Sequence, residues 1–211
     1  MYSNIKYTQN DMSMGHVRVI HTVPDAPNVD VYANDNLIIS DLAYGNYSGY
    51  LSIPEGTYKI TLYAAGTKNN PVLENMLTVN KNSILTVAAV GMLNNIGLVA
   101  IADANQTRKP GKAMIRFLHL SPNAPAVDIT LPNGTVVFSN ISFRNLTHYI
   151  DVIPENYTLQ VRVAGTPNIV LTVPNVNLIA DKFYTVYAIG LVGENPQLEA
   201  LLLLDGVNGE K

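Results

Sequence analysis

The sequence predicts an all-β protein built from two tandem immunoglobulin-like or transthyretin-like β-sandwich domains, and three observations lead to this fold class. The stretch RVIHTVPDAPNVDV, which begins at Arg18, returns as RFLHLSPNAPAVDI at Arg116. Apolar and polar residues alternate with the period of a strand in both halves. The 12 Pro and 14 Gly lie mostly between these runs and interrupt any helical pattern. We expect about seven short strands in each half, as in a sandwich of about 100 residues.

The repeat also sets the domain boundaries, because most landmarks of the two halves align at an offset of 98 to 100 residues. We predict an N-terminal tail (1–15), a first sandwich (16–103), a linker (104–112), a second sandwich (113–206) and a C-terminal tail (207–211). The linker region is short and polar and contains Pro and Gly. A linker of this length favours two domains that touch over two that tumble freely.

In each half, the first two expected strands flank a corner that is rich in proline. In the first half these strands are Val17–His21 and Val29–Ala33, and Pro24 and Pro27 lie between them. Proline fixes φ and biases the preceding residue toward an extended conformation, so the connection should be stiff. We expect a hairpin at this corner that places Asp30 on the same face as Arg18. Tight turns then follow, at 33–36 in the first half and at 132–134 in the second.

The later strands are indicated by their periodicity. In the segment from Thr57 to Ala64, Tyr58, Ile60 and Leu62 alternate with polar neighbours, as in a strand with one buried face. The second half repeats this pattern from Tyr157 to Val163. The runs 84–90 and 201–204 lack alternation and are typical of strands that are buried on both faces. The matching segments LTVAAVG and YTVYAIG end at Gly91 and Gly190.

Composition excludes several classes of function. The net charge is −3 and only 14% of the residues are charged, without the basic cluster that nucleic-acid binding requires. The absence of Cys excludes disulfides, thiolate nucleophiles and Cys-ligated zinc. The N-terminus lacks the apolar core of a signal peptide, and no apolar run approaches 18 residues. From the sequence as written we therefore expect a cytoplasmic protein without membrane insertion.

The repeated corner is the first candidate site, and it has two interpretations. In the structural one, Arg18 pairs with Asp30 while His21 forms hydrogen bonds with the loop backbone, since a corner of this kind leaves backbone groups to be satisfied. Arg116, His119 and Asp128 would do the same in the second half. The alternative is a metal or small-ligand site formed by His21, Asp25 and Asp30. Asp25 is replaced by Asn123 in the second copy, which leaves two ligands where zinc usually takes three or four from the protein.

Catalytic arrangements are weakly supported, and we expect neither enzymatic activity nor a cofactor. Ser121, His119 and Asp128 could form a triad, but Val23 occupies the serine position in the first copy. Glu55 and Glu155 lie in equivalent turns of different domains, so they cannot form the carboxylate pair of a glycosidase. Both glutamates are typical of solvated turn residues.

Tyrosine is the remaining signal in the composition, with 12 Tyr against 4 Phe and no Trp. Most of the strand-associated tyrosines recur in both halves and are expected in the core or at corners, as in the tyrosine corner of sandwich folds: Tyr50, Tyr58, Tyr149 and Tyr157. Tyr47 and Tyr63 do not recur. Because amphipathic rings suit contact surfaces, these two are the candidates for a binding surface.

The combined pattern resembles a large bacterial domain family of unknown function. The residues that carry the resemblance are R-x-x-H-x-x-P-x-A-P-x-V-D, an aromatic-x-x-Y stretch, a Pro-containing turn before a Tyr, and a T-V-x-A-x-G strand. Members often occur as tandem copies in cell-surface or secreted proteins, so the location has two interpretations: cytoplasmic from the chain as written, and the cell surface or a spore layer from the resemblance. The resemblance implies a β-sandwich and no established activity.

From fold class, composition and resemblance, we predict a non-catalytic structural or adhesion module of a bacterial surface, envelope or spore layer. Its expected partner is a protein or a glycan. The alternative from another class is a metal- or small-ligand-binding protein that uses the His-Asp corner of each repeat.

Overall fold

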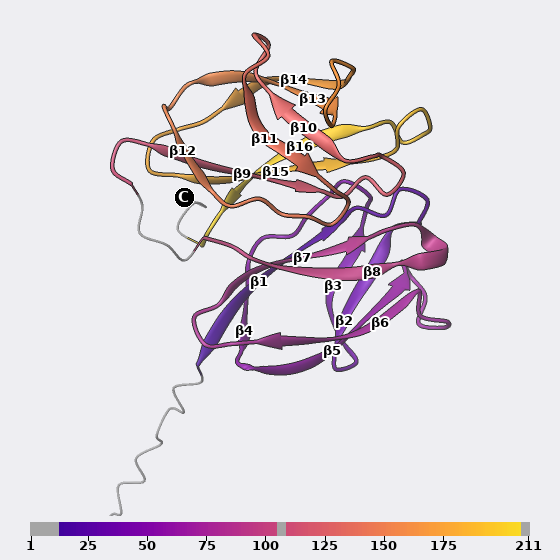
Figure 1. Cartoon of the computed structure of the whole chain (residues 1–211). Coiled ribbons are helices and arrows are strands. Elements are labelled where there is room, and N and C mark those ends of the chain that lie inside the picture. The colour runs from indigo at the N-terminus through magenta and orange to yellow at the C-terminus, as the bar shows by residue number, and fades with distance from the viewer. Residues whose placement is uncertain (1–12, 105–108, 208–211) are drawn as a thin grey trace, which may run out of the picture.

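The computed structural model describes residues 13–104 and 109–207, and within these residues each half of the chain contains eight strands (Figure 1). The first half comprises β1 (Met14–His21), β2 (Val29–Ala33), β3 (Asn36–Leu42), β4 (Leu51–Pro54), β5 (Gly56–Ala64), β6 (Leu73–Val79), β7 (Ile84–Val90), the 3-10 helix η1 (Leu93–Asn95) and β8 (Gly97–Ala102). The second half comprises β9 (Ala113–His119), β10 (Val127–Thr130), β11 (Val136–Ile141), β12 (Ile150–Val152), β13 (Asn156–Val163), β14 (Ile169–Asn177), β15 (Phe183–Ile189) and β16 (Glu199–Asp205). The predicted tails and linker fall partly on 1–12, 105–108 and 208–211, which lie outside the described residues.

Each half is a sandwich of two four-stranded sheets, which confirms the predicted fold class. The orders are β4-β1-β7-β8 and β3-β2-β5-β6 in the first half, and β12-β9-β15-β16 and β11-β10-β13-β14 in the second. Each half thus has eight strands where about seven were expected, one more than the seven of an immunoglobulin constant domain.

The expected hairpin between the first two strands is wrong. β1 pairs with β4 and in parallel with β7, whereas β2 pairs with β3 and β5 in the opposite sheet. The proline corner therefore crosses from one sheet of the sandwich to the other. The amide of Thr22 donates to the carbonyl of Ala89 at 3.0 Å, which holds the start of the corner against β7. Consequently Arg18 and Asp30 lie in different sheets.

The buried hydrophobic residues of the described chain form three clusters, and these clusters define four layers. One fills the first sandwich, with Val19 and Val87 facing Val31 and Leu62. Another fills the second sandwich in the same way. The third joins the sandwiches and consists of Ile20, Ala88, Val90, Ile101, Leu118, Leu120, Tyr187, Ile189 and Leu203. The sheets that contain β1 and β9 therefore pack against each other, as their facing positions in Figure 1 show.

This stacking explains why two strands lack alternation. In β7, Val87 and Ala89 face the first core while Ala88 and Val90 face the other sandwich. All seven residues of β15 are buried. Strands covered on both faces are apolar throughout. No helix in the described part of the chain is long and apolar enough to cross a membrane.

The glycine that ends the seventh strand of the first sandwich offers a test of this packing. Gly91 has φ of +102°, and a Cβ there would lie 2.5 Å from the carbonyl oxygen of Asn95. Gly66 has φ of +74°, yet no described heavy atom lies within 4 Å of its Cβ position. We expect Gly66→Ala to cost about 1 kcal/mol for the left-handed backbone, and Gly91→Ala about 3 kcal/mol because steric overlap is added. Urea unfolding of both variants measures the difference, and equal losses would contradict the close approach.

Candidate functional site

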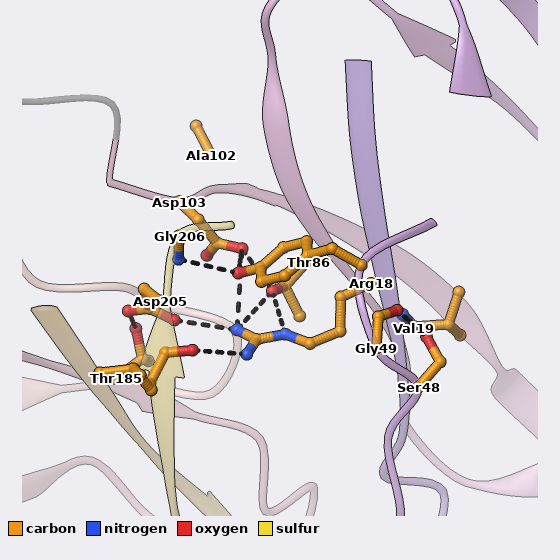
Figure 2. A network of polar contacts seen from close by, with 12 residues as sticks. Arg18, Val19, Ser48, Gly49, Thr86, Ala102, Asp103, Thr185, Asp205 and Gly206 are labelled. Carbon is orange, nitrogen blue, oxygen red and sulfur yellow. Dashed lines mark hydrogen bonds and ion pairs between the residues drawn. The ribbon is translucent and has the colours of Figure 1, made fainter. Parts of the chain in front are cut away.

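A cluster of charged and polar side chains lies between the two sandwiches, and each half contributes the same residue types. We call it the reciprocal clamp, and it consists of Arg18, Thr86, Asp103, Arg116, Thr185 and Asp205. Arg18 and Arg116 are the first residues of the two copies of the repeated motif, and they lie on β1 and β9, on the faces that meet the other sandwich. Asp103 directly follows β8, and Asp205 is the last residue of β16. Figure 2 shows the Arg18 guanidinium between Thr86 of its own sandwich and Asp205 of the other.

Each of the two arginines binds residues of the opposite sandwich. Arg18 donates from its Nη2 to Asp205 Oδ1 at 2.9 Å and from its Nη1 to the carbonyl of Leu204 at 2.8 Å. Arg116 donates in the same way to Asp103 Oδ1 at 2.8 Å and to the carbonyl of Ala102 at 2.8 Å. Each guanidinium thus binds the last strand of the opposite sandwich through two of its nitrogens, a directional arrangement that the planar fork of arginine favours.

Threonine and tyrosine hydroxyls complete the clamp. Thr86 and Thr185 accept from the Nε atoms of Arg18 and Arg116 at 3.0 and 2.7 Å, and donate to the aspartate of their own sandwich. Tyr50 donates to Asp103 at 2.7 Å. The equivalent Tyr149 donates to Asp205 at 2.8 Å. These recurring tyrosines therefore lie at the domain interface, where their hydroxyls satisfy buried carboxylates.

Aromatic rings cover the guanidinium groups. The Cζ atom of Arg18 lies 4.6 Å from the centroid of the Tyr50 ring, and that of Arg116 lies 4.3 Å from the Tyr149 ring. Both distances are within the range of a cation–π interaction. Because desolvation strengthens this attraction, each tyrosine stabilises the clamp through its ring as well as through its hydroxyl.

The clamp is neutral overall and is sealed from solvent. In its ion pairs, the arginine side chains are 2–4% exposed and the aspartate side chains 0%. Burial, followed by the neighbouring Asp205 carboxylate, raises the pKa of Asp103 to about 6, so Asp103 is still ionised at neutral pH. Burial also raises the pKa of Tyr50 and Tyr149, which keeps both phenols protonated as donors. This arrangement can hold two domains together, and it offers no group to a ligand.

The histidines of the two corners bind their own loops. The Nε2 of His21 lies 3.1 Å from the carbonyl of Pro27, and its Nδ1 accepts from the amide of Val23 at 3.3 Å. His119 makes equivalent bonds to Pro125 and Ser121 at 3.1 and 3.3 Å. A carbonyl on one side and an amide on the other assign the neutral Nε2–H tautomer. Burial lowers the pKa of both imidazoles, which matches this assignment.

The aspartates of the motif do not pair with its arginines, so the expected Arg18–Asp30 and Arg116–Asp128 pairs are wrong. Asp30 accepts from the amides of Asp41 and Gly66 at 2.8 and 2.9 Å. Asp128 accepts from the amides of Asn140 and Gly165 at 2.7 and 2.9 Å. Asp41 and Asn140 have φ of +54° and +52°, and the strand register shifts beside them. Each aspartate therefore holds a bulge in the adjacent strand. The arginine of each motif lies in the other sheet of the sandwich, because the corner crosses between the sheets.

The alternative metal site is not assembled. Asp25 accepts from the amide of Leu93 at 2.7 Å, and Asn123 accepts from the amide of Val192 at 2.9 Å. Either residue type can replace the other here because only an acceptor oxygen is needed. His21, Asp25 and Asp30 thus bind three different backbone segments. Within residues 13–104 and 109–207 no three His, Asp or Glu side chains form a group able to hold a metal ion.

The triad considered from the sequence is not formed either. The Nδ1 of His119 is taken by the amide of Ser121, and Asp128 binds Asn140 and Gly165 instead of the imidazole. The buried hydroxyl of Ser121 has no hydrogen-bond partner among the described residues. The serine is therefore not activated by its neighbouring histidine.

The two tyrosines without a counterpart lie on different surfaces. Tyr47 is 50% exposed, and its ring centroid lies 5.9 Å from the Cζ of Arg18, at the rim of the interface. Tyr63 lies half-buried on the outer face of the β3-β2-β5-β6 sheet, where its ring meets that of Tyr32 edge-on at 5.4 Å. These two candidates therefore do not form one surface.

Asp103, Asp205, Thr86 and Thr185 were not identified as site residues from the sequence. Their signal was present, because each half closes on an apolar strand that ends in Asp, and each copy of the T-V-x-A-x-G strand carries the threonine. Pairing them with Arg18 and Arg116 required the three-dimensional arrangement, since 187 residues separate Arg18 from Asp205.

Comparison with known proteins gives one family match and several distant structures. The family model described as Domain of unknown function (DUF4397) matches residues 15–130 and 131–210, so its division falls directly after β10. A family 26 carbohydrate-binding module from Eubacterium rectale Amy13K, solved with maltoheptaose, is 10% identical, with a TM-score of 0.26. A candidate cell adhesion protein from Bacteroides fragilis is 14% identical, with a TM-score of 0.25. Each alignment covers 90% of this chain and 96% of the other. No curated protein matches the chain.

If the reciprocal clamp holds the two sandwiches together, breaking one of its buried ion pairs should lower the unfolding free energy much more than breaking an exposed ion pair. We expect Arg116→Met to cost about 3–5 kcal/mol of unfolding free energy, because it leaves Asp103 buried without its cation. The control is Lys109→Met, which removes a pair with Asp151 whose partners are 59% and 39% exposed and which should cost less than about 1 kcal/mol. Urea unfolding at pH 7 measures both. Similar losses for the two variants would show that the clamp does not hold the domains.

The corner histidines predict a dependence of stability on pH. Since burial lowers the pKa of His21, the unfolded chain takes up a proton before the folded one, and stability falls as the pH drops below about 6.5. His21→Gln removes this contribution, of at most about 1.4 kcal/mol per pH unit. The stability gap between the wild type and His21→Gln should therefore narrow from pH 7 to pH 5. Taking this difference cancels the opposite contribution of Asp103, whose raised pKa favours the folded state as the pH falls. A constant gap would contradict a neutral buried imidazole.

Proposed function

The chain belongs to the DUF4397 family, and on that premise we propose that it is a non-catalytic binding module of a bacterial surface, envelope or spore layer. Its partner is a protein or a glycan. The module binds through the outer sheet face of its first sandwich, while the second sandwich is fixed to the first by the reciprocal clamp.

The use of the buried ionisable groups supports a role without catalysis. Strongly perturbed pKa values often mark active sites, although structural networks perturb them too. Here Asp103 belongs to the sealed clamp, and His21 and His119 have both ring nitrogens bound to their own loops. A catalytic group must reach a substrate, and these groups do not meet solvent.

The observation that carries the proposal is an aromatic pair present in one copy of the repeat. Tyr32 and Tyr63 lie on the outer face of the β3-β2-β5-β6 sheet, opposite Thr61 and Asp30 in the strand register. The same face displays Leu37, 50% exposed, opposite Tyr32, and Met76, 61% exposed, opposite Lys59. Tyrosine supplies contact area with little loss of side-chain entropy, and both Tyr and Met are enriched in interfaces.

The second sandwich provides the contrast. Its residues at the two positions are Thr130 and Arg162, and the Nε of Arg162 donates to Thr130 at 3.0 Å while its Nη2 donates to Gln160 at 2.7 Å. The core positions of the two copies keep their apolar character, so this difference affects only the outer surface. A surface difference between otherwise matched copies fits a binding role for the first.

Binding to cells tests the proposal. We expect the labelled protein to bind cells of the organism that encodes it, and the double variant Tyr32→Ala/Tyr63→Ala to bind at least about tenfold more weakly. The matched control is Thr130→Ala/Arg162→Ala at the equivalent positions, which should bind like the wild type. Protease treatment of the cells removes protein partners, and periodate oxidation destroys glycan partners. The treatment that abolishes binding therefore shows whether the partner is a protein or a glycan.

Equal binding by the two double variants would exclude the first outer face as the binding surface. Fractionation of the native organism addresses the location separately, because a protein confined to the cytosol would contradict a surface role. Both variants must first show wild-type unfolding midpoints, so that weaker binding is not a consequence of unfolding.

A further inference from the structure

The second sandwich contains a cleft of about 300 Å³ at one end, between its two sheets. Its walls are apolar and include Ile115, Leu131, Val137, Val152, Leu159 and Leu178. Two charged residues, Lys112 and Asp151, also line it. We propose that this cleft is a binding site for a small amphipathic monoanion, with an apolar tail between the sheets and an anionic head beside Lys112.

The first sandwich shows that the cleft is not a necessary product of the fold. The equivalent position is lined by Val17, Ala33, Ile38, Ile53, Ile60 and Val79, and its cavity measures about 20 Å³. A cavity of that size holds about one water molecule. Val137 and Val152 are smaller than their counterparts Ile38 and Ile53, but the other side chains of the second set are as large or larger, so the total side-chain size does not explain the space.

The pairing of the edge strands differs between the sandwiches at this opening. In the first sandwich β1 and β4 continue to the pair Met14–Pro54, whereas β9 and β12 end at the pair Ala113–Val152. The second sandwich therefore lacks the last pair at this end. Ile153, the residue after β12, is 62% exposed and lines the cleft. An apolar side chain left at the mouth of an apolar cleft extends the surface available to a ligand tail.

The charges at the cleft determine the charge of the ligand. Asp151 binds Lys109, with 2.7 Å between Oδ2 and Nζ, and its own carboxylate is thereby neutralised. Lys112 has no ion-pair partner among the described residues. The hydrogen bond from Lys109 and, to a smaller extent, the charge of Lys112 lower the pKa of Asp151, but Lys109, Lys112 and Asp151 together carry a net charge of +1, which favours an anion at this end of the cleft. A carboxylate head would fit this ammonium, and a cationic head would meet repulsion.

The volume of the cleft limits the length of the tail. Ligand sites usually have volumes of about 300–1,000 Å³, so this one suits a small molecule. A straight-chain carboxylate combines an apolar tail with an anionic head. Octanoate, whose eight carbons include that of its carboxylate, is therefore the probe for this site.

Isothermal titration with straight-chain carboxylates tests the site. We expect octanoate to bind with a stoichiometry of one, and affinity to rise about fourfold for each methylene from butanoate to octanoate. Affinity should level off from decanoate to tetradecanoate, because the longer tails no longer find room. Octanol and octyltrimethylammonium should bind at least tenfold more weakly than octanoate. A steady rise through tetradecanoate would indicate adsorption to the surface and overturn the proposal, as would equal binding of octanol.

Variants locate the binding. Lys112→Gln should weaken the binding of octanoate about tenfold without changing the binding of octanol. Val137→Phe, whose ring occupies the cleft, should weaken the binding of both. The matched controls are Lys81→Gln and Ile38→Phe in the first sandwich, and neither should change binding. Methyl NMR gives a readout that requires no variant: the signals of Ile115 and Leu159 should shift with octanoate, while those of Ile60 should not. Shifts confined to the first sandwich would overturn the assignment.

Discussion

The exchange of arginines across the domain interface is the interaction on which this structure depends. The side chains of Arg18 and Arg116 each extend from their own sandwich and bind the last strand of the other. Each interfacial aspartate is therefore paired with an arginine of the neighbouring sandwich. Two buried cations and two buried carboxylates would be costly if separated, since an unpaired buried charge destabilises strongly. Their mutual neutralisation fixes the register of the two sheets. The apolar third cluster, with Ile20 and Leu118, can then pack without sliding.

This arrangement determines where the chain can still interact with other molecules. Among residues 13–104 and 109–207, the sheet faces that do not pack against another sheet are those of the two outer sheets, and the two proposed sites occur there and at an open sandwich end. The interfacial sheets use their polar side chains for one another. The low content of charged residues follows in part from this stacking, because strands such as β7 and β15 are buried on both faces and contribute almost no charge.

The sequence predicted the two sandwiches and the buried strands correctly, because periodicity and repeats report on local burial. It failed for Arg18 and Asp30, since the pattern of alternation does not reveal whether a corner stays in one sheet or crosses to another. His21 and Asp30 are separated by 9 positions and looked like one site, yet they bind different backbone segments. Asp205 is distant from Arg18 in the chain, and no local pattern links them. The cleft was also beyond prediction, because the residue types do not reveal that the last strand pair beside it is absent in the second copy.

The reciprocity of the clamp has a consequence for the origin of the molecule. In a dimer with two-fold symmetry, if residue i of one subunit contacts residue j of its partner, then residue j of the first subunit also contacts residue i of the partner. Arg18 with Asp205 and Arg116 with Asp103 reproduce this rule within a single chain. The protein thus has the geometry of a homodimer whose subunits have been fused. Fusion makes assembly independent of protein concentration. It also frees each subunit to diverge, so that Tyr63 and the open cleft could arise in one copy only.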